Sequence, residues 1–505
     1  MNFVSILYAI FILISLVIYW MIKNEKWRLW VILVASLVFY TTLQYQFIPL
    51  LVVLTLINFR LGLALGERSV PRLGSSDWQL SNQEWQTLQI QWDKRRQNIL
   101  WLGIGLNVLL LLGFKYIPFF LNSIAAVLDL PVLQQQANWL GLHLIAPLGI
   151  SFFSFECIAY LIDVYRGAPP TREFLNFAAY KFFFPKLISG PITRYHHLEN
   201  EWKNLKFPNT NRIVEGLWLI ACGAVKKAIL ADNLGIFVKL CFDNLQRTGS
   251  GDLWLATFAY ALQLYLDFSG YVDMAIGSAI LLGLNLPQNF DFPYFSTSIA
   301  DFWRRWHMTL GDWLRNYLYF PLGGSRKGLL RTCFNLLIVM LIAGIWHGAA
   351  WGFIVWGALH GLALVVHRIT DAISHRFSEL KNWWQSVPGI LLAWLITQLM
   401  VFTSWIFFRL PNLKDATWVV QHLWGHQADA QFAQKVYVET LGLERFQLGI
   451  LLGAIFAGMG IIFAVHRGLK LQLSWPVKIM LVPVSLYAVW LFAPKEALPY
   501  IYFDF

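Results

Sequence analysis

The chain has 505 residues and a composition that excludes an ordinary soluble domain. Hydrophobic residues make up 57% of it, aromatic residues 16% and charged residues only 13%, whereas soluble domains carry about 25% charged residues. The apolar residues form long blocks, beginning with an uncharged block from Phe3 to Met21. The composition therefore predicts a polytopic integral membrane protein of the all-α class.

The net charge of +11 does not indicate nucleic-acid binding. Lys and Arg cluster at the edges of the apolar blocks, where a membrane protein needs them, and no soluble domain is available to hold a nucleic acid. The four cysteines lie far apart in or beside apolar runs, and none has metal-ligand spacing with another. We therefore expect neither a metal site nor a disulfide framework.

A membrane-spanning helix needs about 20 apolar residues, which predicts roughly eleven or twelve full spans. We expect the blocks at 174–190 and 333–347 to be short or re-entrant, and Met1 to Ile22 to form the first helix. The candidate blocks lie near 3–22, 28–43, 47–65, 99–122, 140–165, 174–190, 214–242, 253–284, 333–347, 349–367, 389–409, 448–466 and 479–493.

The basic residues predict the orientation of these spans. Clusters such as Lys23 to Arg28 and Lys94 to Arg96 should face the cytoplasm, which places both chain ends outside. Residues 67–97 are then a cytoplasmic loop, which could be partly helical on the membrane surface, and residues 410–447 are the largest outer loop. No internal repeat is visible, so the chain 1–505 is predicted to form a single membrane domain.

One histidine lies where an apolar run must break. Between Thr332 and His367 there is no Asp, Glu, Lys or Arg, and one helix of that length would be too long for a single crossing. Glycines recur every four residues from Gly344 to Gly352, which favours a break with close helix packing there. His347 sits at this point and could handle a proton; alternatively, it hydrogen-bonds a carbonyl and joins two helices.

Two further histidines follow, and neither is a strong candidate for chemistry. His360 lies thirteen residues after His347, which places it on another side of the helix. His367 stands next to Arg368 and is expected at the membrane interface. We interpret both as structural.

A second set of polar residues lies between Asp301 and Tyr319. The spacing of its apolar residues predicts one face of a helix: Trp303, Trp306, Leu310, Trp313 and Tyr317. This helix could lie flat on the bilayer, with His307 on the surface. It could instead border a polar cavity, where Arg304 and Arg305 would attract an anionic donor.

At these residues the chain resembles the membrane-bound O-acyltransferases, and most of all the bacterial branch that acetylates alginate and peptidoglycan and D-alanylates teichoic acids. The resemblance covers most of the chain from about Pro147 onward. The blocks that carry it, in order, are Pro147–Phe155, Tyr160–Arg166, Phe184–Pro191, Lys226–Asn233, Tyr265–Ala275, Asn289–Leu310, Leu318–Gly324 and Gly344–Gly348.

The resemblance implies a fold of helices around a central tunnel, a catalytic core at 289–367 and a multi-pass location in the plasma (inner) membrane. The two histidines of the family match His307 and His347, the second being the essential one. Trp346 and Asn316, with the two arginines above, become candidates for the donor pocket. Asn316 replaces a frequent Asp, and Gly311 a frequent Ser, so no catalytic role is assigned to either.

Within the C-terminal motif at 499–505, residues 500–505 resemble the terminal hexapeptide of the alginate and peptidoglycan acetyltransferases. The tyrosine that is proposed to carry the acyl group in those proteins matches Tyr502. Asp504 replaces a more usual Gln. Alternatively, the tail is an aromatic anchor at the membrane interface.

The resemblance implies transfer of an acyl group across the membrane. We expect no permanently bound cofactor; acetyl-coenzyme A or another acyl thioester would be the donor substrate. His347 would be the general base, and His307 would orient the donor or stabilise the oxyanion. The acceptor would be an exopolysaccharide or cell-wall glycan, reached through a secreted or membrane-tethered SGNH-type transferase. The alternatives are a teichoic acid D-alanyltransferase and a transporter of polysaccharide precursors.

Overall fold

The computed structural model describes residues 3–66 and 82–503, and in these residues the chain is helical with no strand. The all-α prediction is therefore confirmed. The chain divides into two compact units, of which unit 1 comprises Met1–Phe207 with Leu282–Asn285 and unit 2 comprises Pro208–Leu281 with Leu286–Phe505. Each unit is described by itself.

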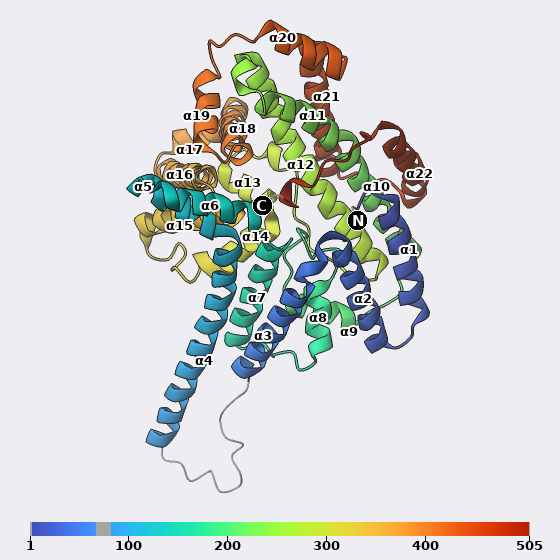
Figure 1. The fold of residues 1–505 in the computed structure, drawn as a ribbon, viewed down its shortest axis with the longest axis vertical. Coiled ribbons are helices and arrows are strands. Elements are labelled where there is room, and N and C mark those ends of the chain that lie inside the picture. Colours follow the sequence, from blue (N-terminus) through green and yellow to red (C-terminus); the bar gives the residue numbers. More distant parts are fainter. Residues whose placement is uncertain (1–2, 67–81, 504–505) are drawn as a thin grey trace. The chain divides into compact units, whose positions relative to one another are not determined.

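Unit 1 begins with α1, which confirms a helix in the first apolar block. Ser5 caps this helix by accepting a hydrogen bond from the Tyr8 amide at 3.2 Å. The helices of unit 1 are α1 (Ile6–Met21), α2 (Glu25–Gln44), α3 (Ile48–Gly66), α4 (Asn82–Leu111), α5 (Ile117–Leu128), α6 (Pro131–His143), α7 (Ile150–Tyr165), α8 (Phe174–Phe182) and α9 (Tyr195–Lys203) (Figure 1).

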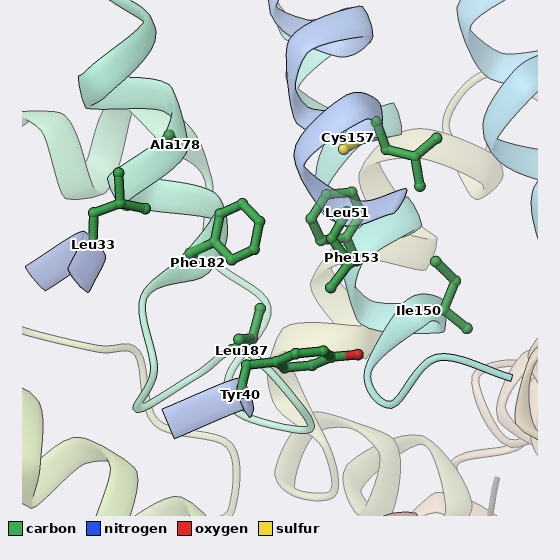
Figure 2. Packing of buried hydrophobic residues seen from close by; sticks show 10 residues of the cluster. Leu33, Tyr40, Leu51, Ile150, Phe153, Cys157, Ala178, Phe182 and Leu187 are labelled. Carbon is green, nitrogen blue, oxygen red and sulfur yellow. The ribbon is translucent and has the colours of Figure 1, made fainter. Parts of the chain in front are cut away.

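An apolar cluster holds α2, α3, α7 and α8 together (Figure 2). Phe153 and Phe182 are almost fully buried, and a buried aromatic side chain contributes about 1.5–3 kcal/mol through the loss of water contact. The cluster consists of Leu33, Tyr40, Leu51, Leu54, Ile150, Phe153, Cys157, Ala178, Phe182 and Leu187.

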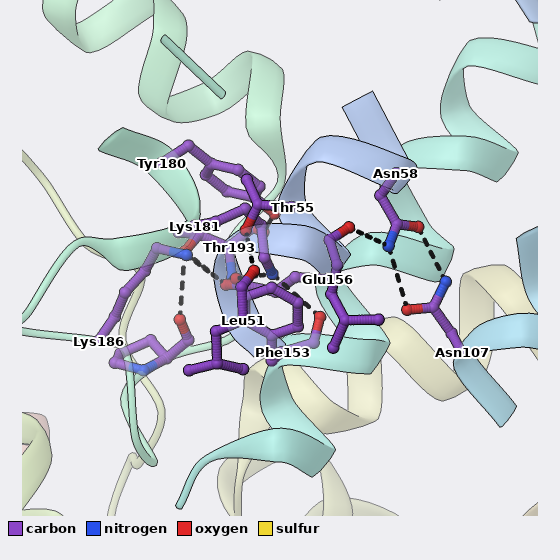
Figure 3. Close-up of polar contacts among 12 residues, drawn as sticks. Leu51, Thr55, Asn58, Asn107, Phe153, Glu156, Tyr180, Lys181, Lys186 and Thr193 are labelled. Carbon is purple, nitrogen blue, oxygen red and sulfur yellow. Dashed lines mark hydrogen bonds and ion pairs between the residues drawn. The ribbon is translucent and has the colours of Figure 1, made fainter. Parts of the chain in front are cut away.

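Beside this cluster lies a buried ion-pair group that the sequence analysis missed (Figure 3). Glu156 accepts hydrogen bonds from Lys186 at 2.5 Å and from Lys181 at 3.0 Å. The amide of Thr193 donates to the same carboxylate at 3.2 Å. These contacts tie α7 to α8 and to the turns that follow it. Removing one partner would leave a buried charge without compensation.

Unit 2 carries both predicted histidines and the C-terminal tyrosine. Its elements are α10 (Thr210–Ala224), the π-helical turn η4 (Val225–Ala231), α11 (Asp232–Phe242), α12 (Ser250–Leu281), η6 (Pro293–Phe295), α13 (Ile299–Arg305), α14 (Met308–Leu314), η7 (Arg315–Tyr319), α15 (Gly328–His347), α16 (Trp351–Ser374), α17 (Ser378–Gln385), α18 (Val387–Arg409), α19 (Leu413–His422), α20 (Ala430–Ala433), η8 (Gln434–Leu441), α21 (Arg445–Phe463), α22 (Trp475–Phe492) and η10 (Ile501–Phe503).

Helices α15 and α16 form a tight hairpin, and the predicted break lies between His347 and Trp351. A Cβ atom on Gly344 would lie 2.3 Å from the carbonyl oxygen of Phe353, and one on Gly348 would lie 2.2 Å from the Phe353 ring. Only glycine permits this approach. The close packing predicted from the glycine spacing is confirmed, and it holds the last turn of α15 rigidly.

Seven segments of the described chain are long and apolar enough to cross a membrane, fewer than the eleven or twelve predicted. They are Glu25–Gly66, Gln89–Leu128, Gly328–His347, Trp351–Ser374, Val387–Arg409, Arg445–Gly468 and Trp475–Phe492. The block at 174–190 forms a short helix followed by turns, as expected. The block at 333–347 belongs to a helix of 20 residues, so the expectation of a short element there was wrong.

Two segments predicted as loops contain helices. The predicted cytoplasmic loop 67–97 is helical from Asn82 onward in α4, and residues 67–81 lie outside the described residues. The outer segment 410–447 contains α19, α20 and η8. Asp252 stabilises this segment in unit 2, because its buried carboxylate accepts hydrogen bonds from the Tyr437 hydroxyl at 2.6 Å and from Arg445 at 2.9 Å.

Candidate active site

His347 is the last residue of α15 and is 2% exposed. The hairpin described above therefore sets its position. Aromatic rings surround its imidazole, with ring centroids at 4.9 Å for Trp346, 5.1 Å for Trp356 and 5.0 Å for Phe408. Electrostatic interactions are strong in such a dry environment, because little water is present to screen them.

His307 lies in a sharp turn, and the prediction of one helix from Asp301 to Tyr319 was wrong. The chain breaks between α13 and α14, and His307 has a left-handed backbone with φ 43°. Such a conformation costs a residue with a side chain about 1–3 kcal/mol. The turn carries the imidazole inward to full burial, which rules out the surface histidine of a flat interfacial helix.

Asn289 holds the turn in place and determines which nitrogen of His307 carries a proton. Its Oδ1 accepts hydrogen bonds from the Thr309 amide at 3.0 Å and the Thr309 hydroxyl at 2.9 Å. The same oxygen lies 3.2 Å from Nδ1 of His307. Because an amide oxygen can only accept, Nδ1 carries the hydrogen and the lone pair lies on Nε2.

Burial lowers the pKa of His307 to about 3. The side chain is therefore neutral in the folded protein near pH 7. A neutral imidazole with Nδ1–H can accept a hydrogen bond or a proton at Nε2, and it cannot donate from that nitrogen to an oxyanion. The sequence did not identify Asn289 as the residue that sets this tautomer of His307. Asn289 was noted only as the first residue of a block that resembles the family.

This lowered pKa predicts a loss of stability in acid. Below pH 6.5 the unfolded chain binds a proton at His307 that the folded protein does not bind. The free energy of unfolding therefore has its full value above pH 6.5 and decreases as the pH falls toward 3. Between pH 7 and pH 5 the contribution should be about 2 kcal/mol. Thermal unfolding of purified protein at both pH values measures it. His307→Asn should show a smaller acid loss, whereas the exposed control His143→Asn should behave like the wild type; equal losses in all three would contradict the prediction.

Tyr502 lies in η10 and is buried, with 5% exposure. Its ring stacks on Phe268 at a centroid distance of 4.0 Å. The centroid is 6.0 Å from that of His307 and 5.8 Å from that of His347. The ring therefore packs among the side chains of unit 2, which is not the placement expected of an anchor at the membrane interface.

Burial also raises the pKa of Tyr502 well above its usual range. A free phenolate is thus disfavoured at this position. Any reaction of the hydroxyl must transfer its proton to a base while the new bond forms. The imidazoles of His307 and His347 are the candidate bases beside the ring, with centroids 6.0 Å and 5.8 Å from it.

The structure brings only some of the predicted site residues together. Trp346 contacts both histidines, with centroid distances of 6.1 Å to His307 and 4.9 Å to His347. Arg304 is exposed, and Arg305 forms an ion pair with Asp301 at 2.9 Å. The donor-pocket role of the two arginines therefore stays a prediction.

Asn316 donates to the carbonyl of Asp312 at 2.7 Å, a bond within its own helical turn. His360 is fully buried and has partners on both ring nitrogens: Trp303 at 3.3 Å and Ser404 at 2.8 Å. These contacts give His360 a structural place between α13, α16 and α18.

A cavity of about 640 Å³ lies elsewhere in unit 2, between α16, α17 and α18. Polar residues such as Asp371 and Lys381 line it together with apolar residues such as Ile396 and Met400. Neither histidine of the pair lines this cavity, and Tyr502 does not either. The candidate active site is therefore the group of packed side chains around Tyr502, which includes His307 and His347.

Residues 150–408 match the family model described as membrane-bound O-acyltransferase family. The chain belongs to the membrane-bound O-acyltransferase family. It is accordingly an O-acyltransferase and a multi-pass membrane protein, as the sequence predicted.

Individual relatives agree with this assignment. The chain is 38% identical over 410 residues to the probable alginate O-acetylase AlgI of Pseudomonas putida, covering 81% of this chain and 76% of the relative. It is 37% identical over 427 residues to the peptidoglycan O-acetyltransferase of Helicobacter pylori, covering 79% and 74%. The teichoic acid D-alanyltransferase of Streptococcus thermophilus is 29% identical over 316 residues, covering 57% and 76%.

Proposed function

We propose that this O-acyltransferase moves an acyl group, most simply acetyl, from a cytoplasmic thioester across the membrane for the O-acylation of an exported polysaccharide or cell-wall glycan. The observation that carries the proposal is the position of Tyr502, whose ring centroid lies within about 6 Å of those of both family histidines. The names of the alginate and peptidoglycan relatives at 38% and 37% identity support an acetyl group and a glycan acceptor.

In the first step, the Tyr502 hydroxyl attacks the carbonyl carbon of the thioester. His347 takes the phenolic proton as the carbon–oxygen bond forms, because the raised pKa of the phenol disfavours prior ionisation. The carbon–sulfur bond then breaks, and the proton passes to the departing thiolate. The products are a phenyl ester on Tyr502 and a free thiol.

His307 has an orienting role in this scheme. Of the two roles expected from the resemblance, the Nδ1–H tautomer favours this one, since the lone pair on Nε2 accepts a hydrogen bond from a substrate hydroxyl or amide. Stabilisation of an oxyanion would require a proton on Nε2, which the lowered pKa opposes.

In the second step, a hydroxyl of the acceptor attacks the carbonyl carbon of the phenyl ester. The bond from that carbon to the Tyr502 oxygen breaks, and the proton of the acceptor hydroxyl passes to the phenolate, which releases Tyr502. A phenol is a better leaving group than a sugar alcohol because its ordinary pKa of about 10 is lower. We propose that a secreted or membrane-tethered SGNH-type transferase delivers the group to the glycan.

The test uses membranes that contain only this protein and an acyl-labelled coenzyme A. We expect label on the C-terminal peptide, detected by mass spectrometry of the intact peptide, with one acyl mass on Tyr502. An unlabelled C-terminal peptide would remove the tyrosine relay if the same membranes transfer label to glycan once the glycan and its transferase are added. No transfer of label to any acceptor would remove the donor that we propose.

A transporter of polysaccharide precursors is the alternative from a different class. Membership of the acyltransferase family favours an enzyme over a transporter. D-alanyl transfer remains a second candidate, supported by the lower-identity teichoic acid relatives.

A further inference from the structure

Three charged residues form a buried cluster beside the C-terminal tail. Nζ of Lys227 lies 2.6 Å from Asp267 and 2.7 Å from Asp232, and the side chains of all three are at most 2% exposed. Lys227 belongs to η4, Asp232 begins α11, and Asp267 lies in the middle of α12. These residues fall in two of the family-like blocks of the sequence, and no step of the proposed reaction uses them.

Each member of this cluster also contacts the tail. Lys227 donates to the carbonyl oxygen of Pro499 at 3.2 Å, and its Nζ lies 4.5 Å from the centroid of the Tyr500 ring. Asp267 accepts a hydrogen bond from the amide of Ile501 at 3.0 Å.

The contacts extend one residue further back, since Asp232 interacts with the backbone of Leu498 through a hydrogen bond. The cluster therefore touches four consecutive tail residues, from Leu498 to Ile501. Three of these contacts are to backbone atoms, so they determine the backbone path of the tail and do not depend on its side chains.

The next residue along that path is Tyr502. Hydrogen bonds to charged partners are stronger than neutral ones, and at full burial no water competes for them. The backbone of Ile501 is held on α12 by Asp267, and the ring of Tyr502 stacks on Phe268, the next residue of α12. The tyrosine thus takes its place from two adjacent residues of one helix.

We infer that Lys227, Asp232 and Asp267 are positioning residues that dock the C-terminal tail and hold Tyr502 between His307 and His347. The inference rests on the proposed role of Tyr502 as acyl acceptor. The cluster carries two carboxylates and one ammonium, so Lys227 is the group whose loss leaves two buried negative charges uncompensated. Asp267→Asn, in contrast, leaves one acid and one base, but its single amide oxygen can accept from only one of the two donors that Asp267 binds, Lys227 at Oδ1 and Ile501 at Oδ2.

The experiment compares Lys227→Met with Lys226→Met in the full-length protein. Lys226 is the adjacent lysine, and it pairs with Asp273 at 2.6 Å, so the control removes the same charge without touching the tail. Two quantities are measured: hydrogen exchange of the C-terminal peptide, and the single-turnover rate of acyl adduct formation at saturating and limiting acyl-coenzyme A.

Lys227→Met should speed exchange of the tail and slow adduct formation by about tenfold to a hundredfold. The donor concentration for half-maximal rate should not change, because the variant displaces the acceptor and not the donor. Lys226→Met should match the wild type, and the adduct rate of Asp267→Asn should lie between those of the wild type and Lys227→Met. A protected tail or a wild-type adduct rate in Lys227→Met would overturn the inference.

A second pair of variants leaves the buried charges intact, in case Lys227→Met does not fold. Ile501→Pro removes the amide hydrogen that Asp267 accepts, whereas Ile501→Ala keeps it. We expect faster tail exchange and a slower adduct rate only in the proline variant, and equal behaviour of the two would overturn the inference. If the wild type forms no adduct, the proposed function fails, and tail exchange alone then decides whether the cluster holds the tail.

Discussion

Replacement of His347 by alanine should abolish acyl transfer while leaving the protein folded. The residue ends α15 beside the Tyr502 ring at a centroid distance of 5.8 Å, where the proposed reaction needs a base. General-base catalysis contributes typically about 10²–10⁴-fold to a rate, and the raised pKa of Tyr502 increases the demand for it. The measurement is transfer of label from acyl-coenzyme A to the C-terminal peptide and to glycan.

A matched control separates loss of chemistry from loss of fold. His367→Ala changes a histidine of α16 that lines the cavity described above, a cavity that neither His347 nor Tyr502 lines, so its rate should stay near that of the wild type. His347→Ala should give a monodisperse protein with an unfolding temperature close to the wild-type value. Transfer at more than about a tenth of the wild-type rate would exclude His347 as the base.

Substitution of Tyr502 by phenylalanine should stop transfer to the glycan and leave no acyl adduct on the C-terminal peptide. Phenylalanine keeps the ring that stacks on Phe268 at 4.0 Å, so packing and the tail path should survive. Only the hydroxyl that accepts the acyl group is lost. An obligatory covalent intermediate makes this loss complete rather than partial.

Tyr500→Phe is the matched control for this substitution, because it removes a hydroxyl two residues away in the same buried tail. The Tyr500 ring packs against Tyr271 at a centroid distance of 5.1 Å, and phenylalanine preserves that contact. The control should retain both the adduct and glycan acylation. If Tyr502→Phe acylates glycan at the wild-type rate, the acyl group bypasses the tail and His347 acts directly on the acceptor hydroxyl.

Several features could be predicted from local sequence because their causes are local. A run of apolar residues determines membrane residence wherever it lies in the chain. The glycines from Gly344 to Gly352 mark a close approach of backbones, since no other residue allows one. The sequence motifs then identified His307, His347 and Tyr502 as candidates through their resemblance to a family.

Other predictions failed because the determining partner is distant in the chain. The helical period from Asp301 to Tyr319 is real in the sequence, yet the segment breaks at His307. Its left-handed turn is held by Asn289, which gathers three hydrogen-bond donors on one oxygen. A periodicity argument considers one segment at a time and cannot include such a contact.

The sequence by itself therefore determined the class of this protein, its apolar helices and the chemical groups available for acyl transfer. Only the tertiary structure decided that two histidines and the C-terminal tyrosine lie together, which nitrogen of His307 holds the lone pair, and how the tail is held. The physical reason is that the tendency of a segment to leave water depends on its own apolar residues, which the sequence shows. An ion pair such as Lys227 with Asp267 depends instead on the distance between two residues, which only the fold provides.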